Sequence, residues 1–270
     1  MKQQVAVVTG ASSGIGAKLA AAMAHRGTHV ILVARSEDRL KVLAAGIRAA
    51  GGQTTVLPCD LSKASAAQRL FDEVMRRDLA VDTLVNNAGF GHWGHFHEEP
   101  LAHLSEMIQV NVTALTELTR LFVPSLVARQ GTVLNLASTV AFQAAPYMAA
   151  YGATKAYLLS LTEALWAEYR SAGLHVTAVC PGPVETPFID AMGSGVRDTS
   201  VFKNTLTVDE VVATCLRALD GRAPVHVVGV WNWLMSQTNR VSPRSLTARI
   251  SAAMLAPRRA APTLAEGGRP

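Results

Sequence analysis

The sequence predicts an α/β protein in which helices cover both faces of a parallel sheet. Short apolar runs rich in Val, Leu and Ile alternate with longer helical stretches along most of the chain. Nearly every predicted strand is apolar on both faces, as strands of a parallel sheet must be when helices cover them. Repeated β–α units of this length indicate right-handed crossovers and a doubly wound sheet.

The predicted elements follow one another in a regular order. The strands are 3–8, 28–34, 53–59, 81–87, 131–137, 174–180 and 225–230. The helices between them are 14–25, 36–50, 62–78, 101–128 and 151–171. After an irregular stretch over 181–206, Thr207 and Glu210 have the spacing of a capping box and begin a further helix. No Pro/Gly/Ser-rich linker interrupts the series, so we predict one domain over 1–230 and a helical tail over 231–270.

Cysteine usage and apolar runs indicate the compartment. The three cysteines form no C-x-x-C pair, which argues against a disulfide framework or a zinc site and for a reducing compartment. The N-terminus MKQQVAVVTG lacks the features of a signal peptide. No apolar run approaches the ~20 residues needed to span a bilayer. We therefore expect a cytoplasmic protein.

The net charge of +5 belongs to the tail. Residues 1–221 hold 18 Lys and Arg against 19 Asp and Glu, whereas 222–270 hold 7 Arg and one acid, Glu266. Because the body of the protein is close to neutral, the basic balance is no evidence for nucleic-acid binding. We expect no nucleic-acid partner.

A glycine-rich run, VVTGASSGIG, follows the first strand over residues 7–16. Its glycines have the order G-x-x-x-G-x-G, which differs from the usual dinucleotide pattern G-x-G-x-x-G. In a doubly wound sheet the first strand–helix turn borders the ligand site, and a helix N-terminus there attracts phosphate. The run is compatible with a dinucleotide site or with a plain strand–helix turn.

The end of the second strand indicates which dinucleotide fits. An NAD site would carry an acid there for the ribose 2′-hydroxyl, but Ala34 and Arg35 occupy the position. An arginine offers a charged fork to a 2′-phosphate, and Arg39 is predicted to lie on the same side. The sequence favours NADP(H); the alternative is a solvated arginine at a helix start.

Residues suited to acid–base chemistry are predicted at the same edge of the sheet. Tyr151 and Lys155 have i, i+4 spacing and lie on one face of a helix. An ammonium beside a phenol favours the phenolate and lowers its pKa from ~10. Ser138 closes the fifth strand, and Asn111 occupies a helical pattern despite its poor helix propensity.

These motifs together resemble the short-chain dehydrogenase/reductase family. The resemblance covers about residues 3–230 and includes TGASSGIG, NNAG at 86–89, Asn111, Ser138, Tyr151-x-x-x-Lys155 and PGPVET at 181–186. It implies a Rossmann fold, and it explains the glycine order, because G-x-x-x-G-x-G is this family's own phosphate loop. NADP-preferring ketoacyl and hydroxysteroid reductases are the most similar branch.

The resemblance also implies roles for individual residues. Tyr151 would exchange the proton and Ser138 would orient the carbonyl. Lys155 would lower the pKa of Tyr151 and hold the nicotinamide ribose, while Asn111 would anchor a water linking Lys155 to solvent. The implied cofactor contacts are Gly10, Ser12, Ser13, Gly14, Ile15, Arg35, Arg39, Asp60, Leu61, Asn87, Ala88, Gly89, Tyr151, Lys155, Pro181, Gly182, Val184 and Thr186.

The activity implied is NADPH-dependent reduction of a hydrophobic ketone or aldehyde to an alcohol, an oxidoreductase reaction on a CH–OH group. Two alternatives stay open. One is a reductase of 3-oxoacyl thioesters on acyl carrier protein or coenzyme A. The other, from a different class, is a catalytically silent regulatory protein that binds NADP(H).

Two segments are candidates for substrate contact. The run GFGHWGHFHEEP contains His92, His95 and His97 but no carboxylate-rich or Cys-containing partner cluster at ligand spacing, so no metal site is expected. We expect Trp93 or Phe96 of this run to touch substrate.

The stretch 183–206 is long for a loop of such a domain and predicts an apolar lid with hinges at Gly193 and Gly195. A plain surface connection is the alternative. The apolar residues of the predicted lid are Phe188, Ile189, Met192, Val196 and Val201.

The tail has apolar residues at helical spacing, with arginines interleaved. Such helices pack on the same subunit, on a partner, or on a membrane surface. Its end, 256–270, is rich in Ala, Pro and Arg, and we expect it to be disordered. By resemblance, helices 101–128 and 151–171 pair subunits, which predicts a homodimer or homotetramer. The apolar tail residues are Trp231, Leu234, Met235, Thr238, Val241, Leu246, Ile250 and Met254, and the arginines are Arg240, Arg244, Arg249, Arg258 and Arg259.

Overall fold

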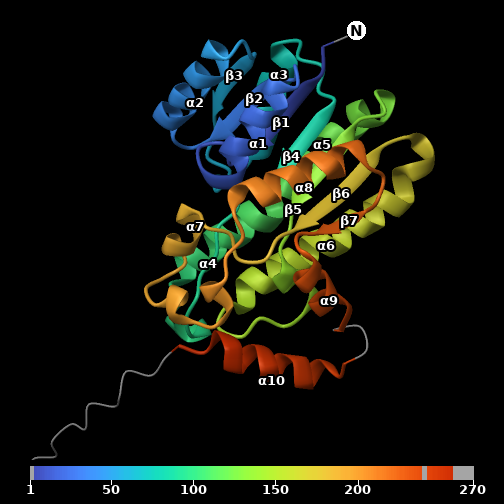
Figure 1. The fold of residues 1–270 in the computed structure, drawn as a ribbon. Coiled ribbons are helices and arrows are strands. Elements are labelled where there is room, and N and C mark those ends of the chain that lie inside the picture. Colours follow the sequence, from blue (N-terminus) through green and yellow to red (C-terminus); the bar gives the residue numbers. More distant parts are fainter. Residues whose placement is uncertain (1–2, 239–241, 258–270) are drawn as a thin grey trace, which may run out of the picture.

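A computed structural model describes residues 3–238 and 242–257 of the chain (Figure 1). Arg240, Val241, Arg258 and Arg259 of the predicted basic tail lie outside the described residues. The expectation of a disordered end falls mostly on 258–270, which also lie outside them.

The sheet has seven parallel strands in the order β3-β2-β1-β4-β5-β6-β7. Strands β2 and β3 are added on one side of β1, and strands β4 to β7 on the other. The order therefore reverses between β1 and β4, where Val8 pairs with Val85. This confirms the doubly wound α/β prediction and places the switch point next to the glycine-rich run. The strands are β1 (Val5–Thr9), β2 (His29–Ala34), β3 (Thr54–Pro58), β4 (Thr83–Asn86), β5 (Thr132–Leu136), β6 (His175–Cys180) and β7 (Val225–Val227).

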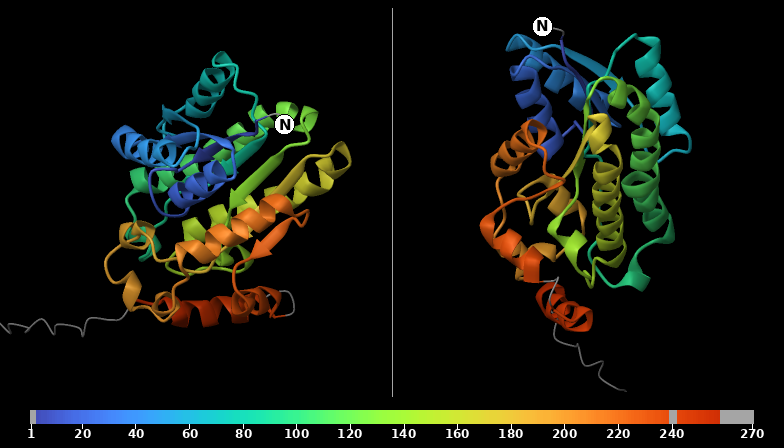
Figure 2. Two further views of the ribbon diagram at one scale, coloured as in Figure 1. Left: turned by 45° about the horizontal axis from the view of Figure 1, so that its top comes forward. Right: turned by 90° about the vertical axis from the view of Figure 1, so that its right-hand side faces the viewer.

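Helices cover both faces of the sheet (Figure 2). One face packs against α1 (Gly14–His25), α2 (Glu37–Ala49) and α8 (Val208–Asp220). The other packs against α3 (Ala66–Arg76), α5 (Leu115–Ala128) and α6 (Ala149–Tyr169). The central strands are almost entirely buried between these layers, which accounts for their apolar residues on both sides, whereas the edge strands β3 and β7 are partly exposed. The predicted capping box of Thr207 and Glu210 begins α8.

The predicted helix over 101–128 is divided. α4 (Leu101–Ile108) and α5 are joined by a π-helical segment, Gln109–Ala114. Such segments are frequent at functional sites. This one contains Asn111, whose side chain bonds to the backbone of Phe90 on a neighbouring loop. The tertiary contact explains an asparagine in a helical pattern.

The predicted helix over 62–78 is shorter, beginning at Ala66. The preceding turn is held by Asp60, which accepts hydrogen bonds from the Ser62 backbone N–H and hydroxyl. Ser65 then adopts a left-handed conformation with φ of 59°. These local bonds compete with helix formation over 60–65.

The remaining segments gather beyond the carboxyl ends of β5 and β6 (Figure 1). The stretch 181–206 contains α7 (Pro187–Ala191) and two short 3₁₀ turns. The tail forms α9 (Val230–Thr238) and α10 (Arg244–Leu255). Within the described ranges, none of the helices has the length and apolar character required to cross a membrane.

Candidate active site

One cavity of about 940 Å³ extends along the carboxyl edge of the sheet, from the glycine-rich loop to the segment 183–206. It is lined by every catalytic and cofactor-contact residue predicted from the sequence except Asn111. The three cysteines are free; Cys180 and Cys215 are buried. The fold therefore brings predicted site residues from seven separate segments to one place.

The glycine-rich loop packs directly against the NNAG turn after β4. Gly10 has φ of +67°, and a Cβ built on it would lie 2.7 Å from Asn87 Nδ2. That amide donates to the carbonyls of Thr9 (2.9 Å) and Gly10 (3.1 Å). Glycine is thus required at position 10 by both conformation and space.

The N-terminus of α1 opens onto the cavity beside this loop. Its N-cap residue, Ser13, makes no side-chain capping bond, and its first turn contains no acid. The first N–H groups of a helix have no partner inside the helix, and the positive end of the helix dipole lies there. This is a site for a phosphate anion.

Arg35 and Asp60 lie at the far end of the cavity. The Arg35 side chain is 67% exposed, and its one ion-pair partner among the described residues is Glu106, at 3.5 Å. Burial would raise the pKa of the Asp60 carboxyl. The bonds from Ser62, followed by the charges of Arg35 and Lys63, outweigh burial and lower that pKa. This end of the cavity therefore offers a guanidinium held only by an exposed ion pair.

Ser138, Tyr151 and Lys155 form the middle of the cavity wall. Ser138 follows β5, and its Oγ donates to the Pro181 carbonyl (3.4 Å) while accepting from the Val140 N–H (3.3 Å). Tyr151 and Lys155 are one turn apart on α6, and each is only 7% exposed. Burial raises the pKa of the Tyr151 phenol, and the Ser138 hydroxyl opposes that shift in part.

The Lys155 ammonium lies 5.8 Å from the centroid of the Tyr151 ring and donates a 2.6 Å bond to the Leu136 carbonyl. Burial lowers the pKa of this ammonium to about 8. The lowering of the Tyr151 pKa by Lys155 stays a prediction. Burial dominates the titration of Tyr151, and the ammonium is directed at a backbone carbonyl.

Asn111 lies behind the cavity wall and is 2% exposed. Its Oδ1 accepts from the Phe90 N–H (3.1 Å), and its Nδ2 donates to the Phe90 carbonyl (2.8 Å) and to Thr154 Oγ1 (3.2 Å). A Cβ built on Gly89 would lie 3.0 Å from Asn111 Oδ1 and 3.7 Å from Lys155 Nζ. The glycine lets the amide and the ammonium approach each other.

The segment 183–206 closes the substrate end of the cavity. Ile189, Met192 and Val196 are each 1% exposed and pack in one apolar cluster with Tyr151. The Phe188 ring lies 5.7 Å from the Tyr151 ring between centroids. Of the two interpretations of this stretch, the structure supports an apolar cover over the cavity.

Comparison with known proteins decides the family. Residues 4–196 match the family model of the short chain dehydrogenases. The chain belongs to the short-chain dehydrogenase family.

Individual relatives agree with this membership. A short-chain dehydrogenase from Pseudocercospora fijiensis is 38% identical over 189 residues, covering 69% of this chain and 61% of the relative, so the chain spans only about three fifths of its length. A fatty acyl-CoA reductase from Acinetobacter baylyi is 34% identical over 248 residues, covering 90% of this chain and 81% of the relative. The solved structure of a short-chain dehydrogenase from Sphingobium yanoikuyae in complex with NADPH is similar with a TM-score of 0.79 at 32% identity, covering 88% of this chain and 94% of that one.

The aromatic residues expected to touch substrate in this short-chain dehydrogenase do not line the cavity. Trp93 is buried, and its Nε1 donates to the Leu255 carbonyl of α10 (2.9 Å). Phe96 is 62% exposed. That prediction is wrong, because the loop uses Trp93 to anchor the tail and directs Phe96 to solvent.

The tail supplies cavity residues that the sequence reasoning missed. Met235 of α9 and Ile250 and Met254 of α10 line the cavity. α10 is also held by the Ser200 hydroxyl, which donates to the Met254 carbonyl (3.0 Å). The i, i+4 spacing of Ile250 and Met254 was the one sequence feature that could have indicated that they share a face of a helix. α10 packs on its own subunit through Ser251 and Leu255, which are buried, whereas Met235, Ile250 and Met254 remain about half exposed.

Proposed function

We propose that this short-chain dehydrogenase is an NADPH-dependent reductase that converts a hydrophobic ketone or aldehyde into an alcohol. One observation carries the proposal: Ser138, Tyr151 and Lys155 meet on the wall of a cavity that joins a phosphate-binding helix end to an apolar, covered end. The polar groups are few and lie together. The apolar surroundings would exclude water from a reacting carbonyl.

The residues present fit a nicotinamide dinucleotide. The uncapped N-terminus of α1 and the space left by Gly10 suit the pyrophosphate, and Asp60 suits the adenosine end. Lys155 and the Pro181–Thr186 segment would hold the nicotinamide ribose and amide. When bound, the reduced nicotinamide supplies the hydride for the carbonyl carbon.

Tyr151 is suited to donate the proton to the carbonyl oxygen. A phenol is protonated at neutral pH, and burial raises the pKa of Tyr151 further, so the side chain holds the proton that an acid catalyst must carry before reduction. Ser138 would hold the carbonyl oxygen, and the Lys155 ammonium would stabilise the phenolate left behind. Lys155 would therefore act after the proton has left Tyr151, when the side chain is a phenolate.

Arg35 and Arg39 support a preference for NADPH over NADH. Both line the adenosine end of the cavity, where Ala34 leaves no acid to repel a 2′-phosphate. The Arg35–Glu106 pair is exposed, so little free energy is lost when the guanidinium turns to a phosphate. The Sphingobium yanoikuyae structure is a complex with NADPH.

A reductase of 3-oxoacyl thioesters is the second candidate. The similarity to a fatty acyl-CoA reductase favours a substrate with an acyl chain, and the apolar cover suits such a chain. Activity on 3-oxoacyl thioesters without activity on free ketones and aldehydes would select this candidate.

The test follows NADPH consumption by the purified protein with ketones and aldehydes of rising chain length. Wild-type protein is expected to turn over apolar carbonyls with NADPH, and Tyr151→Phe is expected to bind NADPH without turnover. NADPH binding with no turnover on carbonyls or thioesters in either protein would instead indicate the silent regulatory protein.

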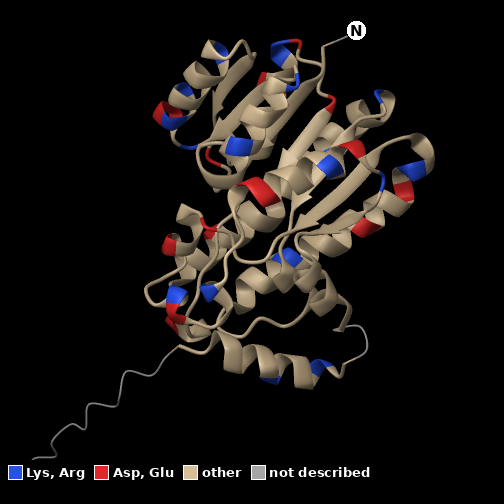
Figure 3. Ribbon diagram, in the orientation of Figure 1, with Lys and Arg blue, Asp and Glu red and all other residues tan. Residues whose placement is uncertain are grey.

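We also propose that α9 and α10 contact an anionic lipid surface. These helices carry eight exposed large apolar side chains. α9 has no charged residue, and Figure 3 shows basic but no acidic residues on α10. Between residues 222 and 257 the sequence has four Arg and no Asp or Glu. Apolar side chains flanked by arginines favour an anionic membrane over a neutral partner. The exposed side chains are Val230, Trp231, Trp233, Leu234, Met235, Leu246, Ile250 and Met254.

A homodimer or homotetramer formed through α4, α5 and α6 is proposed from the family resemblance. Light scattering of the purified protein measures its mass directly; a monomer would contradict the proposal.

A further inference from the structure

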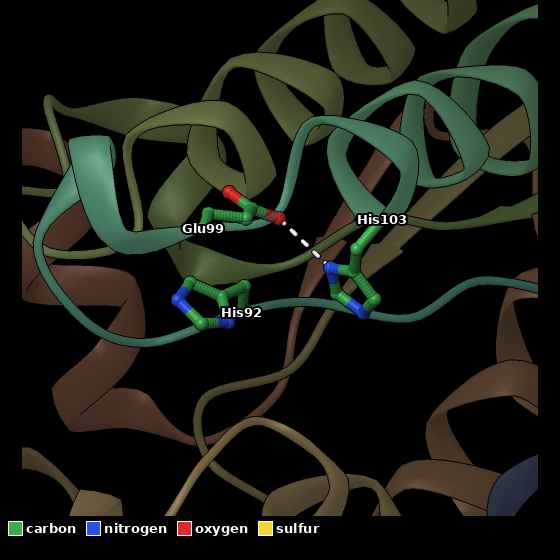
Figure 4. A group of neighbouring side chains, drawn as sticks. All are labelled: His92, Glu99 and His103. Atoms are coloured by element: carbon green, nitrogen blue, oxygen red, sulfur yellow. Dashed lines mark hydrogen bonds and ion pairs between the residues drawn. The ribbon is translucent and has the colours of Figure 1, made fainter.

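Three metal-ligating side chains converge beside the cavity, outside the residues assigned to the reaction (Figure 4). His92 lies on the loop after β4, Glu99 just before α4, and His103 on α4. His103 Nδ1 and Glu99 Oε1 are 2.9 Å apart, and one ligand atom from each of the three residues lies within 4.8 Å of the others. The sequence predicted no metal site, because Glu99 and His103 were not recognised as partners of His92.

The polar groups of this cluster have few partners. The Glu99 side chain is only 4% exposed, and its one ion-pair partner among the described residues is His103. Nε2 of His92 is buried and has no hydrogen-bond partner in the described part of the chain. A buried carboxylate with one partner and an unpaired imidazole nitrogen are both costly without a compensating charge or bond.

We propose that His92, Glu99 and His103 bind a divalent transition-metal ion, with Zn²⁺ as the best match. Two imidazoles and one carboxylate are a ligand set typical of zinc, and they leave a fourth position for water. Bonds of about 2.0–2.2 Å require the ligand atoms to approach to roughly 3.4 Å. Rotation of the His92 ring toward the Glu99–His103 pair would achieve this approach.

The metal would stabilise the loop that borders the proposed substrate end. The Trp93 N–H donates to the Met192 carbonyl (2.8 Å), and the Gly94 N–H donates to the Tyr147 carbonyl (2.9 Å). A Cβ built on Gly91 would lie 2.9 Å from the Tyr151 ring, so this loop packs against the tyrosine. The site itself does not depend on the proposed reaction.

Metal binding can be measured on chelator-treated full-length protein. Titration calorimetry with Zn²⁺ is expected to show one bound ion per chain, and the thermal midpoint is expected to rise with Zn²⁺ concentration. Co²⁺ in the same site should give the visible absorption of a four-coordinate ion. Glu99→Gln and His103→Ala are expected to weaken binding at least about tenfold, a loss of about 1.4 kcal/mol.

The same loop provides matched controls. His95 and His97 are exposed and lie outside the cluster, so His95→Ala and His97→Ala should leave the affinity unchanged. His92→Phe keeps a ring and leaves the Glu99–His103 pair intact, so it tests the site even if the other variants fail to fold. No bound Zn²⁺ in the wild type, or binding lost in His95→Ala but kept in His92→Phe and Glu99→Gln, would overturn the proposal.

Discussion

The Lys155 ammonium donates a 2.6 Å hydrogen bond to the backbone carbonyl of Leu136. Leu136 is the last residue of β5, and Lys155 lies on α6, so the bond ties the proposed catalytic helix to the carboxyl edge of the sheet. It also gives the buried charge a partner. Burial nevertheless lowers the pKa of this ammonium to about 8, against an ordinary value of 10.5.

That difference predicts a pH dependence of stability. The unfolded chain binds the lysine proton more tightly than the folded chain, so folding becomes more favourable as pH rises from about 8 to 10.5. The free energy of unfolding of the wild type, relative to Lys155→Met, should rise over this window by at most about 3 kcal/mol. Urea unfolding of both proteins across these pH values measures it. If the difference in unfolding free energy between the wild type and Lys155→Met stays constant with pH, the pKa of Lys155 is not lowered by folding.

Arg35→Ala tests the cofactor preference. Losing a charge-assisted bond to a 2′-phosphate costs about 2–3 kcal/mol, so kcat/KM for NADPH should fall about 30- to 160-fold while that for NADH changes little. Arg48→Ala is the control, because Arg48 lies on α2, the helix that follows Arg35, but does not line the cavity. Equal losses with both cofactors would refute a role for Arg35 in recognising the phosphate.

Substituting alanine at two glycines with positive φ distinguishes the cost of backbone strain from the cost of a steric clash. Gly10 and Gly51 have φ of +67° and +84°, but only a Cβ on Gly10 meets other atoms within 4 Å. Gly51→Ala should lower the free energy of unfolding by about 1 kcal/mol, and Gly10→Ala by about 3 kcal/mol with weaker NADPH binding. Thermal unfolding and a binding titration measure both effects. Similar losses in the two variants would show that the contact of Gly10 with Asn87 is unimportant.

Sedimentation with lipid vesicles tests the surface of α9 and α10. Trp233 and Leu246 are each 50% exposed and do not line the cavity. The double variant Trp233→Ser/Leu246→Ser should bind phosphatidylglycerol vesicles at least about tenfold more weakly than the wild type, because both apolar groups leave the bilayer interface. Val42→Ser, on α2, is the control for an exposed apolar residue elsewhere. No binding by the wild type, or equal binding to phosphatidylcholine vesicles, would count against an anionic lipid partner.

The sequence predicted most of the sheet because its signals are local. Apolar runs located each strand to within about three residues, and alternation with helices implied the parallel order. Many residues that line the cavity could also be predicted from the sequence, because the carboxyl ends of parallel strands meet at one edge of the sheet. Gly10, Ser138 and Tyr151 could therefore be assigned to one site before the structure.

Features that depend on long-range contacts were missed. Nothing in the local pattern showed that Trp93 bonds to Leu255, which is 162 residues away. The same holds for the break in the helix at Asn111, which depends on the Phe90 backbone. The burial that raises the pKa of Tyr151 also depends on residues far apart in the chain, among them Trp93 and Met192, and the i, i+4 spacing with Lys155 does not show it.

The most direct test of the central claim is to follow the hydride itself. Wild-type protein is incubated with an apolar ketone and NADPH that carries deuterium at the transferred position, and the product alcohol is analysed by mass spectrometry. We predict one deuterium on the carbinol carbon with the wild type and a rate at least about 100-fold lower with Tyr151→Phe. Transfer at the same rate by Tyr151→Phe, or no labelled alcohol from ketones, aldehydes or 3-oxoacyl thioesters, would contradict the account.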